Sequence, residues 1–156
     1  MSTRLATLSL VAVLGASPVL AQESGAEIFA ARCAACHQPG GAGLPGIAPP
    51  LASTLGGRLA APAGRAYLAQ VVVSGMTGMI EVHGVRYTGA MPSFANLPDA
   101  ALAAVLNHVL EQFNAETRPA GAPPVTVADI VAARVAALRP HEVRRLRNTP
   151  LAGGAS

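Results

Sequence analysis

The spacing of apolar residues along the chain predicts a small helical protein. Residues 64–74, 98–113 and 126–138 carry apolar side chains three and four positions apart, which places them on one face of an α-helix. The stripe within residues 98–113 consists of Leu102, Val105, Leu106, Val109, Leu110 and Phe113. The stripe of the last segment consists of Ile130, Val131, Val135 and Leu138. The pattern therefore indicates an all-α fold.

Capping signals indicate where two of the helices begin. Ser24, followed three residues later by Glu27, forms a capping box and predicts a further helix over residues 25–36. Pro98 fits the first turn of the helix that carries the clearest stripe, and Asp99 is favourable beside its positive end.

The segments between the helices are rich in proline and glycine, which predicts loops. Residues 39–50 form a loop after the first helix, and residues 118–124 form a linker. Residues 80–87 have the pattern of a short hairpin. Pro140 ends the last long helix, and residues 141–147 are expected to form a short basic helix.

The first 21 residues have the features of a secretory signal peptide. A positive start that includes Arg4 precedes an apolar run over residues 5–16, and small residues precede an expected cleavage after Ala21. A membrane anchor is the alternative, but the apolar region is short and carries Pro18. Export of a chain that is rich in alanine and free of lysine, a bacterial type of composition, predicts a periplasmic protein.

The two cysteines of the chain lie in one C-x-x-C-H motif, formed by Cys33, Cys36 and His37. On a helix, residues three and four positions apart share one face, so the three side chains would lie together. Two thiols on that face can add to the two vinyl groups of a haem, and the imidazole can reach the iron as the proximal ligand. The motif therefore predicts one covalently bound haem c.

Other interpretations of the motif fit less well. A thioredoxin-like pair needs a preceding strand and a βαβ context, whereas a helix is predicted before this pair. A structural zinc site needs four ligands, and the remaining histidines are scattered along the chain. These are His83, His108 and His141. A disulfide within the motif would close a very short loop.

Residues 25–113 resemble class I cytochrome c. Gly25 and Phe29 precede the motif at the spacing at which that family packs its first helix against its last. Pro49 follows the motif at the spacing of the family's loop proline. The resemblance implies that the Pro49 carbonyl accepts the other ring N–H of His37, which would fix the tautomer of the imidazole.

The resemblance also implies a domain organisation. Residues 1–21 are the expected signal peptide, and residues 22–117 are the expected cytochrome domain, folded around one haem. Residues 118–156 are expected to form a Pro/Gly linker and a short, basic, helical C-terminal extension.

The second axial ligand is also implied by the resemblance. The family usually uses a methionine that is followed by proline, shortly before the last helix, and Met91 with Pro92 matches this pattern. A thioether is a soft ligand that favours ferrous iron and raises the reduction potential. Met76, Met79 and His83 are the alternatives.

The chain departs from the family at two points. His108 stands where the last helix usually carries an aromatic residue, and we interpret it as a packing residue against the first helix. The absence of lysine removes the family's frequent docking ring. Arg58 and Arg86 are the candidates to pair with a haem propionate, the alternative being a solvated guanidinium.

Charge is divided along the chain. Residues 22–117 hold four arginines and six acidic residues, whereas residues 118–156 hold six arginines and two acidic residues. The basic segment is expected to fold back on the acidic part or to dock an acidic partner, with a solvated helix face as the alternative. Nucleic acid is not expected as a partner, because the protein is exported and no aromatic residues are interleaved with the arginines.

The expected function is periplasmic electron transfer by one haem with histidine and methionine ligation. The expected partners are a dehydrogenase donor and an oxidase or reductase acceptor, which the protein serves as a free carrier or as a dedicated subunit. No stable membrane anchor is expected. The alternative is a haem enzyme or gas sensor with an open sixth coordination site.

Overall fold

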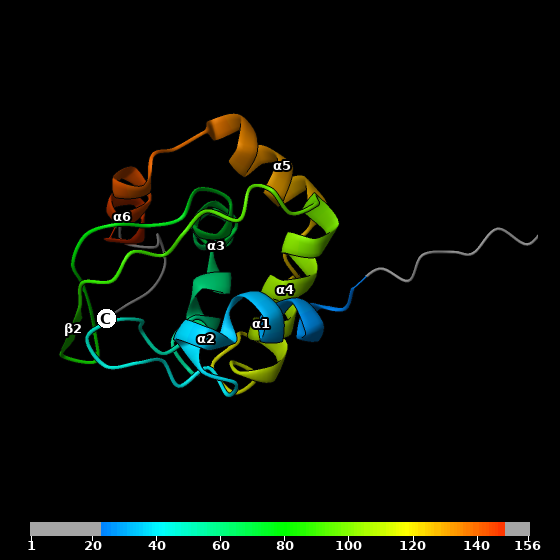
Figure 1. The fold of residues 1–156 in the computed structure, drawn as a ribbon. Helices are drawn as coiled ribbons and strands as arrows, with labels where there is room; N and C mark the ends of the chain where they lie inside the picture. The colour runs from blue at the N-terminus through cyan, green and yellow to red at the C-terminus, as the bar shows by residue number, and fades with distance from the viewer. Residues whose placement is uncertain (1–22, 149–156) are drawn as a thin grey trace, which may run out of the picture.

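A computed structural model describes residues 23–148 of the chain (Figure 1). The elements are α1 (Gly25–Arg32), α2 (Ala34–His37), η1 (Gly56–Ala60), α3 (Pro62–Ser74), β1 (Ile80–Val82), β2 (Val85–Tyr87), α4 (Asp99–Gln112), α5 (Val127–Ala136) and α6 (Pro140–Asn148). The helices dominate, and the two strands form one antiparallel hairpin, so the predicted all-α cytochrome-like fold is confirmed. The expected signal peptide lies outside the described residues.

The first helix packs against α4, as the spacing of Gly25 and Phe29 predicts. A side chain at Gly25 would run into the backbone of Ala104, so only glycine allows this close approach. The Phe29 ring contacts His108 at a centroid distance of 5.8 Å, and His108 contacts Phe113 at 5.5 Å. His108 is therefore a packing residue between the two helices, as predicted.

The first predicted helix is interrupted within the motif. The capping box of Ser24 and Glu27 forms, but α1 ends at Arg32. Cys33 is its C-cap residue, with φ of −116°, and α2 begins one residue later. Pro98 is the N-cap of α4 rather than a first-turn residue, because its ψ of 150° is extended.

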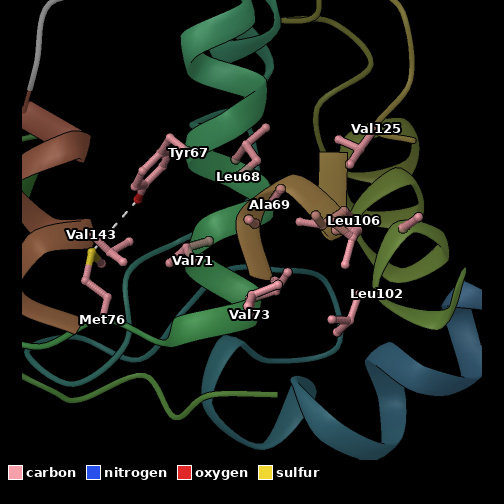
Figure 2. Close-up of a cluster of buried hydrophobic side chains, with 14 of the residues drawn as sticks. Tyr67, Leu68, Ala69, Val71, Val73, Met76, Leu102, Leu106, Val125 and Val143 are labelled. Carbon is pink, nitrogen blue, oxygen red and sulfur yellow. Dashed lines mark hydrogen bonds between the residues drawn. The ribbon is translucent and has the colours of Figure 1, made fainter. Parts of the chain in front are cut away.

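Helix α3 lies at the centre of the molecule and carries a continuous run of buried residues. Its apolar side chains pack with those of α4, α5 and α6 in one hydrophobic cluster (Figure 2). The cluster includes Leu68, Val73, Leu102, Leu106, Val125 and Val143. Burial of this area stabilises the fold by the hydrophobic effect and fixes α3 beside the site described below.

The C-terminal extension folds back onto this cluster. Figure 1 shows α5 and α6 arching over α3. Ile130 of α5 and Val143 of α6 are both 0% exposed. The Asn107 side chain donates to the Val125 carbonyl over 2.8 Å and accepts from the Val125 N–H over 2.9 Å. The basic segment was expected either to fold back on the rest of the protein or to dock an acidic partner. The structure shows that it folds back.

The predicted stripe on α5 is wrong at two positions. Val131 and Val135 face solvent, and Val135 is 81% exposed. The buried face of the helix is instead formed by Ile130 and Ala133, three residues apart.

Among the described residues, no helix is long and apolar enough to cross a membrane.

Candidate functional site

The three residues of the C-x-x-C-H motif lie on one short turn at the junction of α1 and α2. The N–H groups of Cys36 and His37 both donate to the Cys33 carbonyl, over 3.1 and 2.9 Å. The turn ends at Gln38, whose positive φ of 63° turns the chain away from the helix. Cys36 is exposed, Cys33 is partly buried and His37 is buried.

A cavity of about 410 Å³ opens beside this turn. Its walls come from α1, α2, the loop that follows, η1, α3, the β-hairpin, the segment before α4, α4 itself and α6. The wall residues are mainly apolar and include Phe29, Ile47, Leu68, Val71, Val72, Ile80, Leu106 and Val109. All five residues predicted for the site line this one cavity, namely Cys33, Cys36, His37, Pro49 and Met91.

The His37 imidazole is held in one orientation by the loop after α2. Its Nδ1 lies 2.9 Å from the Pro49 carbonyl oxygen, as the resemblance implies. Because a carbonyl only accepts, Nδ1 must carry the proton, and the lone pair of Nε2 is free for a metal ion. Burial lowers the pKa of His37 below its ordinary value, against the opposing effect of the Pro49 hydrogen bond, so the ring is neutral at pH 7.

The loop that carries Pro49 is closed by its own backbone. The Gly43 N–H donates to the His37 carbonyl over 2.9 Å, and Leu44 and Ala48 pair as an isolated antiparallel bridge. Gly43 has a φ of 76°, and a side chain there would lie within 2.6 Å of the Ala48 carbonyl oxygen. Glycine is therefore required where the loop folds back toward His37.

The thiols of the motif differ in environment. Burial raises the pKa of Cys33 to about 11, and the neighbouring Cys36 adds to this effect. The Cys33 thiol therefore stays protonated at neutral pH and is a poor nucleophile without help.

Met91 lies on a segment that is joined to the end of α3. Its N–H donates to the Met76 carbonyl over 2.9 Å, and the Met76 N–H donates to the Met91 carbonyl over 3.0 Å. The Ser93 hydroxyl donates to the Val73 carbonyl over 2.6 Å and extends the junction. Both methionines line the cavity. Met79, the other methionine considered, is 51% exposed and is not among the lining residues.

One part of the cavity wall carries two positive charges. Arg58 lies over the Tyr67 ring, 4.7 Å from its centroid, and donates to the Arg147 carbonyl over 2.9 Å. Arg58 and Arg147 both line the cavity, whereas Arg86 is exposed and lies outside the lining. Burial lowers the pKa of Arg58, and the nearby Arg147 adds to this effect, against the opposing influence of Tyr67. Of the two arginines that the sequence offered as candidates, only Arg58 lines the cavity.

Arg147 and Tyr67 are site residues that sequence reasoning missed. Arg147 belongs to α6, and its only signal in the sequence is the basic character of the last helix. His83, an alternative ligand in the sequence analysis, lies in the hairpin turn with a φ of 50°, is exposed, and is one of the residues that line the cavity.

The residues around the cavity fit a covalently attached haem. Two thiols and a neutral imidazole with a free lone pair lie on one turn, and two thioethers line the same space. The apolar walls suit a porphyrin, and the two guanidiniums are complementary to two propionates.

Comparison with known proteins also indicates a protein that carries a covalently attached haem. A family model described as cytochrome c oxidase, cbb3-type, subunit III, matches residues 20–109. A relative named cytochrome c-552, from Thermus thermophilus, is 44% identical over 124 residues, which covers 80% of this chain and 83% of the relative. A second cytochrome c-552 from the same species is 43% identical over 122 residues, which covers 78% of this chain and 92% of the relative.

The chain therefore belongs to the cytochrome c family, as a class I cytochrome with one covalently bound haem c. It is an electron-transfer protein, and electron transfer implies redox partners.

Proposed function

We propose that the chain is a periplasmic electron carrier whose haem is attached to Cys33 and Cys36 and is ligated by His37 and Met91. The observation that carries the proposal is the 2.9 Å contact between His37 Nδ1 and the Pro49 carbonyl. It leaves Nε2 as the only ring nitrogen available to a metal, in a cavity that Met91 also lines. The bound haem would supply a one-electron redox couple.

The protein residues set the conditions for rapid electron transfer. The Pro49 carbonyl keeps the imidazole in one orientation, and the paired backbones of Met76 and Met91 hold the thioether segment to α3. Because rigidly held ligands keep nearly the same position in both oxidation states of the iron, the reorganisation energy of electron transfer stays small. The apolar walls exclude water and disfavour the extra charge of ferric iron, which raises the reduction potential.

Arg58 and Arg147 would neutralise the propionates. Both guanidiniums lie at the Tyr67 side of the cavity, where two like charges without an anion would repel each other. A pair of carboxylates at that place would satisfy both and would orient the cofactor in the cavity.

We infer that the protein accepts electrons from a dehydrogenase and passes them to an oxidase or reductase. The matching family is described as a subunit of an oxidase, which supports an oxidase as the acceptor. Residues 118–148 are packed against α3 and α4 through Val125, Ile130 and Val143. This packing supports a self-contained carrier over a subunit with a free docking arm.

Reoxidation of the reduced protein tests the carrier function. The full chain, matured in a bacterial periplasm and reduced, is mixed with membranes that contain a haem–copper oxidase. The proposal predicts reoxidation that depends on the oxidase and is blocked by cyanide at the oxidase. Rapid reoxidation by oxygen without membranes would contradict it and would favour the enzyme or sensor alternative, because it requires an open site at the iron.

A further inference from the structure

Two methionines stand side by side at the cavity wall. Met76 and Met91 exchange both of their backbone hydrogen bonds in an isolated antiparallel bridge. Residues that face each other directly in such a pair project their side chains to the same face, with Cβ atoms about 5.5 Å apart or less. Both side chains also line the same cavity. The pairing therefore presents two thioethers, rather than one, to the cofactor space.

The close approach of the two segments is built into the backbone. Gly75, which precedes Met76, has a φ of 72°, and a side chain there would lie 2.5 Å from the Met91 carbonyl oxygen. The Phe94 N–H donates to the Val72 carbonyl over 2.9 Å and continues the contact. Because the two backbones are joined at several points, the two methionines hold a fixed position relative to each other.

The thioether of Met76 has a polar partner inside the protein. The Tyr67 hydroxyl lies 4.0 Å from the Met76 sulfur, and Figure 2 shows the two side chains directed toward each other. Met76 is 9% exposed and Tyr67 is buried. Burial raises the pKa of Tyr67 against the opposing effect of the two arginines, so the hydroxyl keeps its proton and can donate to sulfur.

A sulfur lone pair that accepts from a hydroxyl is less available to a metal. Methionine has three rotatable bonds and adapts to irregular spaces, so the Met76 sulfur can leave the hydroxyl without moving its backbone. Met79, by contrast, is exposed and does not line the cavity. It therefore offers a matched control on the same loop.

We propose that Met76 is a reserve axial ligand, which is held by the Tyr67 hydroxyl and binds the haem iron when Met91 vacates the sixth position. The inference rests on the proposed function, in which Met91 is the resident ligand. The exchange breaks one iron–sulfur bond and forms another, and it changes neither the oxidation state nor the number of protons.

The test uses the full-length haem protein with Met91→Leu, Met76→Leu, the double variant, and Met91→Leu combined with Met79→Leu. Two properties are measured after covalent haem content and helicity have been checked. The first is the long-wavelength absorption band of ferric haem that reports an iron–thioether bond. The second is the rate of carbon monoxide binding to the ferrous protein.

The proposal predicts that Met91→Leu keeps the thioether band, with or without Met79→Leu. It also predicts that this variant binds carbon monoxide at least tenfold more slowly than the double variant, which lacks the band. A Met91→Leu protein without the band that binds carbon monoxide as fast as the double variant would overturn the inference. A bis-histidine spectrum in Met91→Leu would also overturn it, because a histidine would then be the recruited ligand.

Tyr67→Phe in the Met91→Leu background tests the hydroxyl. Loss of a competing hydrogen bond is expected to slow carbon monoxide binding about 2- to 10-fold. An unchanged or faster rate would contradict the role of Tyr67.

If the proposed function is wrong, the variants should show a different pattern of thioether bands from the one expected if only the reserve role of Met76 is wrong. A wild-type protein without the thioether band would remove Met91 as the resident ligand and the reserve role with it. A band that is lost in Met76→Leu alone but survives in Met91→Leu would make Met76 the resident ligand, and it would overturn both assignments.

Discussion

The positive charges beside Tyr67 show how single residues tune the cavity. Arg58 of η1 and Arg147 of α6 are 89 positions apart in the sequence, and they meet through one hydrogen bond. A positive charge close to the haem stabilises the ferrous state relative to the ferric state, and its removal should therefore lower the reduction potential.

Substitution of Arg147 tests this electrostatic role. Arg147→Gln removes one charge from the cavity wall, and a nearby charge in a medium of moderate dielectric contributes on the order of 1 kcal/mol, roughly 40 mV for one electron. We expect the midpoint potential, measured by optical redox titration, to fall by tens of millivolts. Arg86→Gln, at an exposed position of β2, should change it by less than a third of that amount. Equal shifts in the two variants would indicate a general charge effect and contradict a specific role.

For single residues of the site, the sequence is informative where the chemistry requires a fixed spacing between neighbouring positions. The motif alone indicates Cys33, Cys36 and His37, because their spacing is set by one helical turn. Met91 and Pro49 follow only from the family resemblance. Arg147 could not be predicted, since its position depends on how α6 docks on α3, which no local pattern encodes.

The contact between α1 and α4 depends on one glycine. Gly25→Ala would place a methyl group against the Ala104 backbone and the His108 side chain, and overpacking of this kind costs about 1–3 kcal/mol. We expect a lower midpoint in guanidinium unfolding of the haem protein. Gly40→Ala is the control, because a side chain there meets nothing within 4 Å, and it should be nearly neutral. Equal stability of the two variants would mean that the helices separate without cost.

The start of α6 is held by hydrogen bonds to the Glu142 carboxylate. The Glu142 carboxylate accepts from the Arg139 guanidinium over 2.8 Å and from the Arg139 N–H over 2.7 Å, and these bonds lower its pKa from 4.5 to about 2. A lowered carboxyl pKa gives stability that is fully present above pH 4.5 and is lost as the pH falls toward 2. The melting temperature of Glu142→Gln should therefore be below wild type at pH 7, and the two should converge near pH 2.

Glu116→Gln removes an exposed carboxylate and is the control for this experiment. It should show little difference from wild type at either pH. A difference between Glu142→Gln and wild type that is the same at both pH values would exclude ionisation of Glu142 as its cause.

The elements themselves could largely be predicted because capping boxes and apolar stripes are local signals. The box of Ser24 and Glu27 forms as predicted, and Thr126 and Asp129 form another. The error at Val131 and Val135 arose because a weak stripe in an alanine-rich helix does not define its buried face. The buried face of α5 is instead determined by packing of Ala133 in the cluster that α5 forms with α3 and α4.

In the molecule as a whole, the extension is part of the core. Ile130 is fully buried in the main cluster, so Ile130→Ala should lower the free energy of unfolding by about 2–5 kcal/mol. Val135→Ala, on the exposed face of the same helix, should change it by no more than about 0.5 kcal/mol. Denaturant unfolding followed by circular dichroism distinguishes them, and equal effects would contradict the packing of α5 on α3.

The whole-molecule arrangement was the least predictable level. The sequence indicated a linker and two further helices, but a basic tail is equally compatible with a docking arm. The buried apolar residues of α5 and α6 were too few and too small for the pattern to distinguish these arrangements.

The optical spectrum of the periplasmically matured protein, with and without carbon monoxide, tests the central claim most directly. The account predicts a covalent c-type haem with a ferric thioether band and a ferrous spectrum that carbon monoxide changes only slowly. Rapid carbon monoxide binding without a thioether band would contradict methionine ligation, and the absence of covalent haem would contradict the account as a whole.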